Sequence, residues 1–385
     1  MLDKMQMVDL RGQYEKIKSE VNLSIQKVID DTAFINGPQV KEFSKDLAKY
    51  LKVKHVITCA NGTDALQIAL MALGLKYGDE VIVPAFTYVA TAEVIGLLGL
   101  TPVMVDVNYD TFNVELKNIE KALSPKTKAI VPVHLFGQSA DMEPILKFAN
   151  KHHLFVIEDN AQAFGTVYTF SNGTKAFTGT MGTIGCTSFF PTKNLGCYGD
   201  GGALYTNDDE LAEKVHMIAN HGQKVKYHHL VIGCNSRLDT IQAAILDVKL
   251  KYLDSYLAAR QATAEYYNNA LKDVKGIIIP KVIKNSTATY HQYTLKIVDG
   301  EVVGKDGVSK RDALKAFLAE AGIPSMIYYP LPLQEQDAFK PITREAEPLP
   351  ISKKLAYSVL SLPMHTELTH EIQDKVIERV REFFK

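Results

Sequence analysis

The chain has 385 residues, 46% of them apolar and 23% charged. This length exceeds a single ordinary hydrophobic core, so we expect two domains. The 43 lysine and arginine residues nearly balance the 44 aspartate and glutamate residues, which leaves a net charge of -1. Such a balance provides no long-range attraction to nucleic acid or to an anionic membrane, and we expect neither as a partner.

The cysteines and the N-terminal residues predict a cytoplasmic protein. The four cysteines form no CxxC pair and lack metal-ligand spacing, which indicates reduced thiols and no metal site. They are Cys59, Cys186, Cys197 and Cys234. Residues 1–6 lack the apolar segment of a secretory leader, and no stretch reaches the roughly 18 apolar residues of a membrane span.

Between residues 51 and 250, strand-like apolar runs alternate with amphipathic helical runs. This alternation is typical of an α/β fold in which helices cover a mostly parallel central sheet. We expect strands at 56–59, 80–83, 102–105, 129–133, 155–158 and 202–206, and helices that begin near Thr63, Ala90, Val114, Met142 and Asp208. Because ligands bind at the carboxyl ends of the strands in open α/β sheets, we expect the binding site along that edge.

The pattern changes near residue 250. Residues 238–270 predict one long helix that leads into a second domain. Further elements are expected as strands at 276–279 and 293–297, helices at 310–321 and 370–384, and an exposed hairpin at 298–308. We therefore predict a large domain at residues 1–250 and a smaller C-terminal α+β domain at residues 251–385.

Lys193 is the most informative residue of the chain. It lies in the segment 187–203, among apolar, aromatic and glycine residues. Poor hydration disfavours the charged form of an amine, so the pKa of such a lysine falls and its free base can attack a carbonyl group. These properties predict a lysine that forms a Schiff base.

A second candidate is Asp159, which follows the apolar run of a buried strand. A lysine that traps an aldehyde and a carboxylate at a strand end together suggest pyridoxal phosphate, whose ring nitrogen needs an acidic partner to stay protonated. A cap for a following helix is the alternative role of Asp159. The neighbouring Glu158 is expected to point the opposite way, because side chains alternate along a strand.

Phosphate binding is predicted for the segment 58–66, where a strand ends and a helix begins. Backbone amides at a helix N-terminus bind phosphate, Gly62 permits close approach, and Thr63 adds a hydroxyl group. Ser188 is placed to supply a second hydroxyl group. An ordinary strand, turn and helix, capped by Asn61 or Thr63, is the alternative interpretation of this segment.

The segment 84–93 brings two aromatic rings to the end of a strand. Phe86 is explained by core packing, whereas Tyr88 is the better candidate to stack on a planar cofactor, because its hydroxyl group favours a partly polar site. The pair Gly201 and Gly202 indicates a tight turn and not a dinucleotide site.

Together these segments resemble the DegT/DnrJ family of sugar-nucleotide aminotransferases, which are fold-type I pyridoxal phosphate enzymes similar to aspartate aminotransferase. The resemblance covers nearly the whole chain, from 7–14 and 34–38 to 362–365. Its most specific motifs are Ala60-Asn-Gly-Thr-Asp-Ala65, Phe86-Thr-Tyr-Val-Ala-Thr91, Glu158-Asp-Asn-Ala-Gln162, Ser188-Phe-Phe-Pro-Thr-Lys193 and Gly233-Cys-Asn-Ser-Arg-Leu-Asp239.

The resemblance implies a role for each motif. Lys193 carries the cofactor as a Schiff base and is the catalytic residue, Asp159 pairs with the pyridine nitrogen, and Gln162 contacts the cofactor near its phenolic oxygen. Tyr88 stacks on the ring. The residues that hold the phosphate are Gly62, Thr63 and Ser188. Asn235 reaches the phosphate in the neighbouring subunit, which makes a homodimer the catalytic unit.

Within the family, the chain is most similar to the UDP-2-acetamido-2-deoxy-hexuluronate 3-aminotransferases of the WbpE/WlbA type. The shared segments are 197–202, 227–229 and 235–239. This similarity implies that Arg237 pairs with the carboxylate of the uronate, for which its planar guanidinium group is well suited. A salt bridge between Arg237 and Asp239 is the structural alternative.

One departure from the family concerns the substrate. Where these enzymes usually have His-Tyr-Pro, this chain has Tyr328-Tyr329-Pro330. The direct contact of that histidine with the sugar nucleotide or with glutamate is therefore lost. We expect Tyr328 and Tyr329 to take part in substrate binding.

The expected function is the transfer of an amino group from L-glutamate to a keto sugar nucleotide. The expected acceptor is C3 of UDP-2-acetamido-2-deoxy-3-keto-glucuronate, used for surface polysaccharide biosynthesis. The alternatives are an aminotransferase for a dTDP-linked keto-deoxysugar, a deoxysugar dehydratase, and a regulator that senses pyridoxal phosphate without catalysis. Dehydratases of this fold carry histidine at the position of Lys193, and such regulators usually carry a DNA-binding region, which is not expected here.

Overall fold

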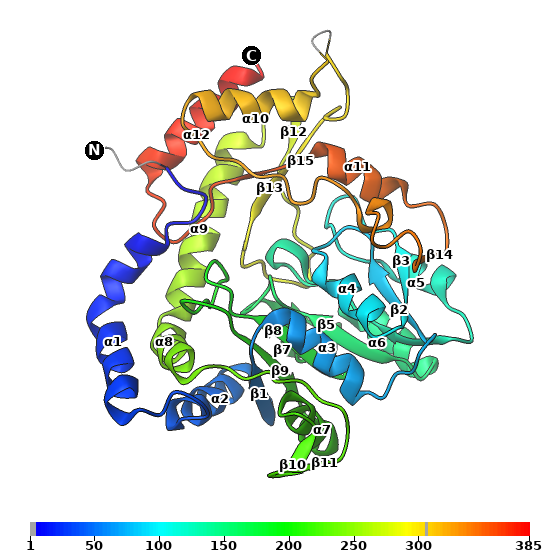
Figure 1. The fold of residues 1–385 in the computed structure, drawn as a ribbon. Coiled ribbons are helices and arrows are strands. Elements are labelled where there is room, and N and C mark those ends of the chain that lie inside the picture. Colours follow the sequence, from blue (N-terminus) through cyan, green and yellow to red (C-terminus); the bar gives the residue numbers. More distant parts are fainter. Residues whose placement is uncertain (1–4, 305–306) are drawn as a thin grey trace.

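An eight-stranded, mostly parallel sheet forms the centre of the molecule (Figure 1). The computed structural model describes residues 5–304 and 307–385. The strands of this sheet are β1 (His55–Cys59), β2 (Glu80–Pro84), β3 (Thr101–Val105), β4 (Thr127–Ile130), β5 (Phe155–Asp159), β8 (Ile184–Ser188), β9 (Gly202–Thr206) and β14 (Arg344–Glu345). Their order is β1-β9-β8-β5-β4-β2-β3-β14. Strand β9 is antiparallel to both of its neighbours, and the other pairs are parallel.

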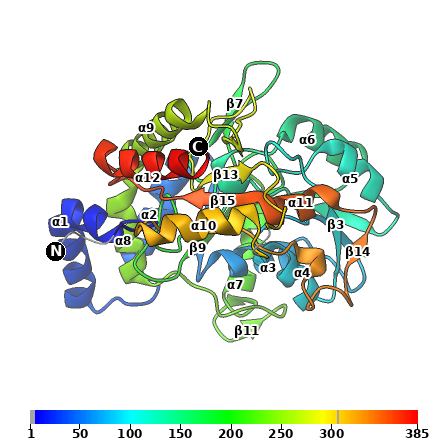
Figure 2. The ribbon, with the colours of Figure 1, turned by 90° about the horizontal axis from the view of Figure 1, so that it is seen from above.

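Helices cover both faces of the sheet, as the view from above shows (Figure 2). One face is covered by α3 (Gly62–Ala72), α4 (Ala90–Leu97) and α7 (Asp209–Ala219), and the other by α5 (Leu116–Ala122) and α6 (Met142–Lys151). Near β1 and β9 lie α2 (Pro38–Leu51) and α8 (Thr240–Leu250), whose apolar side chains pack with Phe189 and Tyr205. The N-terminal helix α1 (Leu10–Asp31) packs on α8.

A smaller sheet follows α9 (Leu253–Leu271). Its strands are β12 (Ile277–Ile278), β13 (Tyr293–Ile297) and β15 (Val359–Leu362), with β13 in the middle. The helices around it are α10 (Lys310–Glu320), α11 (Pro350–Ser358) and α12 (His370–Phe383). Strand β14 lies between α10 and α11 in the chain but pairs with β3 of the large sheet. The division into domains at residue 250 stays a prediction.

Short elements complete the fold. Two hairpins project from it. One consists of β6 (Val167–Thr169) and β7 (Lys175–Phe177), and the other of β10 (Gln223–Val225) and β11 (His228–His229). Single 3-10 turns occur at η1 (Leu135–Gly137) and η2 (Leu333–Glu335). Among the described helices, none combines the length and the apolar character that crossing a bilayer requires. Two sequence-based predictions fall partly outside the described residues. They concern the N-terminus, where residues 1–4 are not described, and the hairpin at 298–308, where residues 305–306 are not described.

The strands predicted within the first 250 residues are all present, with small shifts at their ends. The prediction of one helix over 238–270 is wrong, because the chain forms α8 and then α9. At the break, Lys251 and Tyr252 donate to carbonyls three residues back, at 3.3 and 3.0 Å, which tightens the last turn and ends α8. Buried apolar residues occur on both sides of the break, such as Val248 and Leu253, so the hydrophobic periodicity alone did not reveal the end of α8.

Candidate active site

Lys193 lies in a compact turn between β8 and β9. Its backbone N–H donates to the Phe190 carbonyl at 2.8 Å. The turn is closed by bonds from the Phe189 N–H to the Gly201 carbonyl at 2.7 Å and from the Cys197 N–H to the Phe189 carbonyl at 2.8 Å. Since β8 runs parallel to and beside β5, the turn holds Lys193 at the edge of the sheet where β5 ends.

The Lys193 amine is poorly hydrated. Loss of water lowers its pKa to about 8, and the negative charge of Asp159 opposes this shift. The desolvation inferred from the sequence is therefore present in the structure. An amine with this pKa has an appreciable free-base fraction near neutral pH, which is what attack on a carbonyl requires.

Asp159 ends β5 and is 6% exposed. One carboxylate oxygen accepts a hydrogen bond from the Thr91 hydroxyl at 2.8 Å, and the other accepts one from the Ala161 N–H at 3.1 Å. In the described chain the next element after β5 is the strand β6, not a helix. The helix-cap interpretation of Asp159 is therefore wrong, and its carboxyl group is left buried at the end of the strand.

Glu158 points away from Asp159, as predicted. It is buried and binds the His134 ring at 2.8 Å. The other ring nitrogen of His134 accepts from the Ala140 N–H at 3.1 Å, so Nε2 carries the proton that is donated to Glu158. Three backbone N–H groups also donate to Glu158, those of Gly179, Met181 and Gly182, at 2.7, 2.6 and 2.5 Å. Glu158 therefore fixes a turn, whereas Asp159 serves the site.

The segment after β1 forms a tight cradle at the N-terminus of α3. Asn61 caps the helix, since its side chain accepts from the Asp64 N–H at 2.8 Å. Within the described chain, the N–H groups of Gly62 and Thr63 have no hydrogen-bond acceptor. A Cβ atom on Gly62 would lie 2.6 Å from the Cβ atom of Ser188. The structure thus brings together the three residues predicted to hold phosphate, and Asn61 provides the cap that the alternative interpretation also predicts.

One side of the candidate site is partly aromatic and is formed by Gln162, Tyr88 and Tyr329. The Gln162 side chain donates to the Tyr329 hydroxyl at 2.9 Å and accepts from the Phe136 N–H at 2.9 Å. The Tyr329 ring lies 6.1 Å from that of Tyr88 and 6.0 Å from that of Tyr328. The Tyr88 side chain is 54% exposed, which leaves a ring face available for stacking. Burial raises the pKa values of Tyr328 and Tyr329, so both act as neutral hydroxyl groups.

The segment that carries Asn235 and Arg237 is tied to the cradle by the residue between them. Ser236 is buried, accepts from the Ala60 N–H at 3.0 Å and donates to the Asp64 carboxylate at 2.6 Å. Asn235 is exposed and Arg237 is half-buried. Arg237 forms neither an ion pair nor a hydrogen bond with any residue that the structure describes, so the alternative salt bridge to Asp239 is not formed.

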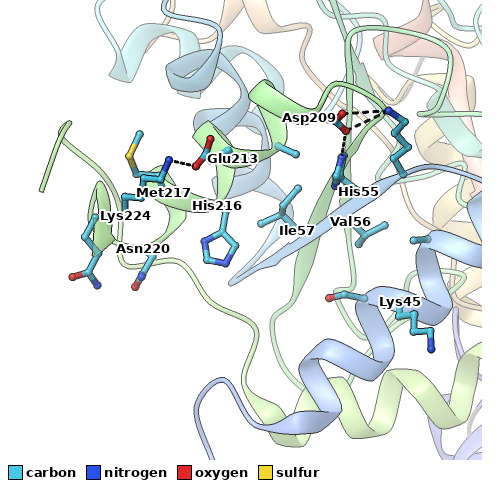
Figure 3. Close-up of a pocket in the computed structure, with 15 residues that line it drawn as sticks. Lys45, His55, Val56, Ile57, Asp209, Glu213, His216, Met217, Asn220 and Lys224 are labelled. Carbon is cyan, nitrogen blue, oxygen red and sulfur yellow. Dashed lines mark hydrogen bonds and ion pairs between the residues drawn. The ribbon is translucent and has the colours of Figure 1, made fainter. Parts of the chain in front are cut away.

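A groove of about 810 Å³ lies elsewhere, between α2, β1 and α7 (Figure 3). None of the predicted site residues lines it. Several of its charged side chains pair with one another: Asp209 binds His55 at 2.6 Å and Lys54 at 3.4 Å, and Glu213 binds Lys224. Because Lys193 and Asp159 both lie outside it, we place the candidate reaction site at the end of β5 and not in this groove.

Two residues of this site received no role from the sequence. Thr91 binds Asp159, and Ser236 joins two segments that are far apart in the chain. Both lie inside the motifs that identified the family, and that position was the available signal. What the sequence does not contain is the partner of each hydroxyl group, because both partners are remote in sequence.

A model of the DegT/DnrJ/EryC1/StrS aminotransferase family matches residues 15–381. The chain belongs to this family. Three relatives are similar to it over nearly their whole length. A pleiotropic regulatory protein of Geobacillus stearothermophilus is 47% identical over 98% of both chains. A UDP-2-acetamido-2-deoxy-3-oxo-D-glucuronate aminotransferase of Pseudomonas aeruginosa is 46% identical over 94% of this chain and 96% of its own. A UDP-N-acetyl-3-dehydro-alpha-D-glucosamine 3-aminotransferase of Acidithiobacillus ferrooxidans is 43% identical over 95% and 94%.

Solved structures agree with this assignment. A DegT/DnrJ/EryC1/StrS aminotransferase from Brucella abortus superimposes with a TM-score of 0.92 at 43% identity and covers 99% of both chains. NtdA from Bacillus subtilis with bound PMP superimposes with a TM-score of 0.87 at 30% identity, covering 100% of this chain and 86% of its own. The predicted fold-type I architecture and the predicted aminotransferase activity are confirmed.

The cofactor of this DegT/DnrJ/EryC1/StrS aminotransferase is pyridoxal phosphate, and the residues present fit it. Lys193 offers a desolvated amine and Asp159 a buried carboxylate. The cradle at Gly62 is too tight for a side chain and presents free N–H groups, which suits a phosphate group. These observations support the predicted roles of the individual residues, which stay predictions.

Proposed function

We propose that this aminotransferase moves an amino group from L-glutamate to a UDP-linked 3-keto sugar acid, UDP-2-acetamido-2-deoxy-3-keto-glucuronate, for surface polysaccharide biosynthesis. The observation that carries the choice of an acidic sugar is Arg237, a half-buried guanidinium group without a partner in the described chain. The relative from Pseudomonas aeruginosa, named for this same acceptor, supports it.

The side chains of this chain account for the steps that a protein must provide. Pyridoxal phosphate, when bound, supplies the sink for the electrons of the broken bond. The Nζ atom of Lys193, with a pKa of about 8, takes up and releases a proton near neutral pH and so acts as the acid and base. Asp159 holds a negative charge beside the site, and the cradle at Gly62 and Thr63 anchors a phosphate group.

The amino transfer balances in two halves. Glutamate gives up its amino group, takes up one water molecule at the same carbon and leaves as 2-oxoglutarate, and the sugar ketone then gains that amino group and releases one water molecule. Turnover of purified protein with glutamate and a panel of keto sugar nucleotides tests the proposal. The expected result is one 2-oxoglutarate for each amino sugar, with the UDP-linked uronate as the preferred acceptor. Preference for a dTDP-linked deoxysugar would contradict the substrate assignment.

A regulatory role is the second candidate, because the relative from Geobacillus stearothermophilus is named a pleiotropic regulatory protein. Catalysis is favoured because the matching family model describes aminotransferases and two of the three relatives are named as aminotransferases. The same turnover experiment separates the two roles. Absence of amino transfer with every acceptor of the panel would favour the regulator.

Replacement of Arg237 by lysine should impair the sugar half-reaction. Lysine keeps the charge but loses the planar fork that binds a carboxylate through two hydrogen bonds, and loss of such a contact typically costs about 2 to 5 kcal/mol. Single-turnover kinetics should show a slower reaction with the uronate and a nearly unchanged reaction with glutamate. Equal losses in both halves would instead indicate a structural or glutamate-binding role for Arg237.

We further propose that the working unit is a cytoplasmic homodimer with shared sites. Apolar side chains of the segment 225–232 are exposed, with Tyr227 at 79% and Ile232 at 88%, and apolar surface of this kind favours burial against another subunit. Asn235, just beyond this segment, is exposed and free to reach that subunit. The free cysteines fit a reducing compartment.

Light scattering should therefore give about twice the 42.7 kDa mass of one chain. Ile232→Asp should lower this mass toward that of one chain, because a buried carboxylate would oppose the interface. A Leu97→Asp variant is the control, since Leu97 is 71% exposed on α4, away from the segment 225–232. An unchanged mass for Ile232→Asp would place the interface elsewhere.

A further inference from the structure

A second buried lysine contacts the turn that carries Lys193. Lys249 lies near the end of α8 and is 1% exposed. Its Nζ atom donates a hydrogen bond to the Gly196 carbonyl at 2.5 Å and lies 5.4 Å from the centre of the Tyr198 ring. Burial lowers the pKa of this amine to about 8. The reaction proposed above does not use it.

Keeping a lysine at this position is costly. Its amine loses hydration, and its donors need acceptors once water is excluded. Within the described chain, the Gly196 carbonyl is the one hydrogen-bond acceptor of the Lys249 amine, and this amine is the one donor to that carbonyl. A methionine of similar size would fill the space without burying an amine. The contact with Gly196 therefore explains the lysine better than packing does.

Gly196 is the tightest point of the turn. A Cβ atom at this position would lie 2.5 Å from the Pro191 carbonyl oxygen and 2.7 Å from the Phe190 carbonyl oxygen. The Phe190 carbonyl is also the acceptor for the Lys193 N–H. The carbonyl that Lys249 holds thus belongs to the same closely packed backbone as Lys193.

Helix α8 holds the turn at a second point. Gln242 accepts a hydrogen bond from the Tyr198 N–H at 2.8 Å. Gln242 and Lys249 are separated by about two helical turns and so lie on one face of α8. Between them, Leu246 is fully buried in the cluster that contains Phe189 and Cys197 of the turn. Helix α8 is therefore a rigid support on which the turn rests.

We propose that Lys249 is a positioning residue for the amino transfer. By holding the Gly196 carbonyl, it keeps the turn in the shape that presents the Lys193 amine to the cofactor. The proposal rests on the proposed role of Lys193, and Lys249 itself contacts neither substrate nor cofactor. Because misplacement of a reacting group by about 1 Å can cost about 100-fold in rate, one such support has a large effect.

The test compares Lys249→Met with Lys251→Met, a control at an exposed lysine of the same helix end. Hydrogen exchange of the cofactor-free proteins is measured first. In Lys249→Met, the amide hydrogens of Cys197 and Tyr198 should exchange at least about tenfold faster, because the turn loses the hydrogen bond from Lys249 to the Gly196 carbonyl. The melting temperature should change by only a few degrees, since the lost hydrogen bond is offset by removal of a buried amine. The control should match the unmodified protein in both measurements.

Kinetics complete the test. In Lys249→Met, cofactor capture and kcat should fall about tenfold to 100-fold, whereas KM for glutamate stays within about twofold. Lys249→Gln, which keeps a donor, should recover part of the loss. Unchanged exchange and unchanged kcat in Lys249→Met would overturn the proposal. A large drop in melting temperature with faster exchange throughout the chain would also overturn it, because Lys249 would then be structural.

The two proposals can fail separately. If the unmodified protein transfers no amino group to any acceptor, the proposed function fails. Exchange in the segment 189–201 and the rate of cofactor capture by Lys193 still measure the effect of Lys249, because neither requires a substrate.

Discussion

Lys193→Ala should abolish amino transfer and the visible absorption of the cofactor-bound enzyme. Alanine removes the amine that forms the Schiff base, and it also removes the base, which alone contributes about 10²- to 10⁴-fold to such reactions. The yellow colour belongs to a protonated lysine Schiff base of pyridoxal phosphate, so it should disappear with the amine. Absorption spectra and turnover of the purified variant give both results.

The matched control for Lys193→Ala is Lys175→Ala, which removes an exposed lysine from β7. This variant should keep colour and rate. Borohydride reduction followed by peptide mapping locates the attachment point directly. A reduced adduct on any lysine other than Lys193 would show that the assignment is wrong.

The pH dependence of cofactor capture follows from the same amine. Capture requires the free base, and the pKa of Lys193 is lowered to about 8 by loss of water. Below that pH the protonated form predominates, so the capture rate of the cofactor-free protein should rise with pH and level off above about pH 9. A rate that continued to rise beyond about pH 10 would indicate an ordinary solvated lysine.

The regular part of the fold was predictable because its signals are local. The strands β2 and β5 are fully or almost fully buried, so they appear in the sequence as short apolar runs, and a turn residue follows each run. The end of each strand could therefore be placed, and with it Asp159. Parallel pairing then brings these ends together.

Long-range contacts and helix ends were not predictable in the same way. The strand β8 contains Gly185 and is preceded by Gly182, so it lacks a clear strand pattern, yet it is buried between β5 and β9. The break between α8 and α9 depends on which neighbours each helix packs against. Likewise, Thr91, Ser236 and Lys249 act on partners many residues away, and a single sequence does not reveal such pairs.

Asp159→Asn should slow amino transfer strongly while the fold persists. Asparagine keeps the size of the side chain and an oxygen that can accept from the Thr91 hydroxyl, which Asp159 binds at 2.8 Å. It loses the negative charge that stabilises a protonated pyridine nitrogen, so the cofactor becomes a weaker electron sink. Removal of one such electrostatic contact typically costs about 10²- to 10³-fold in kcat. Single-turnover kinetics with glutamate measures this loss.

Glu158→Gln is the control. It distinguishes the effect of losing a carboxylate in the candidate site from the effect of losing a buried carboxylate outside that site. Glu158 accepts hydrogen bonds from the His134 ring and from three backbone N–H groups. The NH2 group of a glutamine at this position would point at some of these N–H donors and could not accept from them. Each lost charge-assisted bond costs about 1.5 to 3 kcal/mol. This variant should therefore unfold at a clearly lower temperature, whereas Asp159→Asn, which loses only the bond from the Ala161 N–H, should melt at a temperature lowered much less and should lose activity instead. Near-normal turnover in Asp159→Asn would show that the carboxylate at the end of β5 only organises its turn through Thr91 and Ala161, and that the negative charge beside the cofactor must come from another residue.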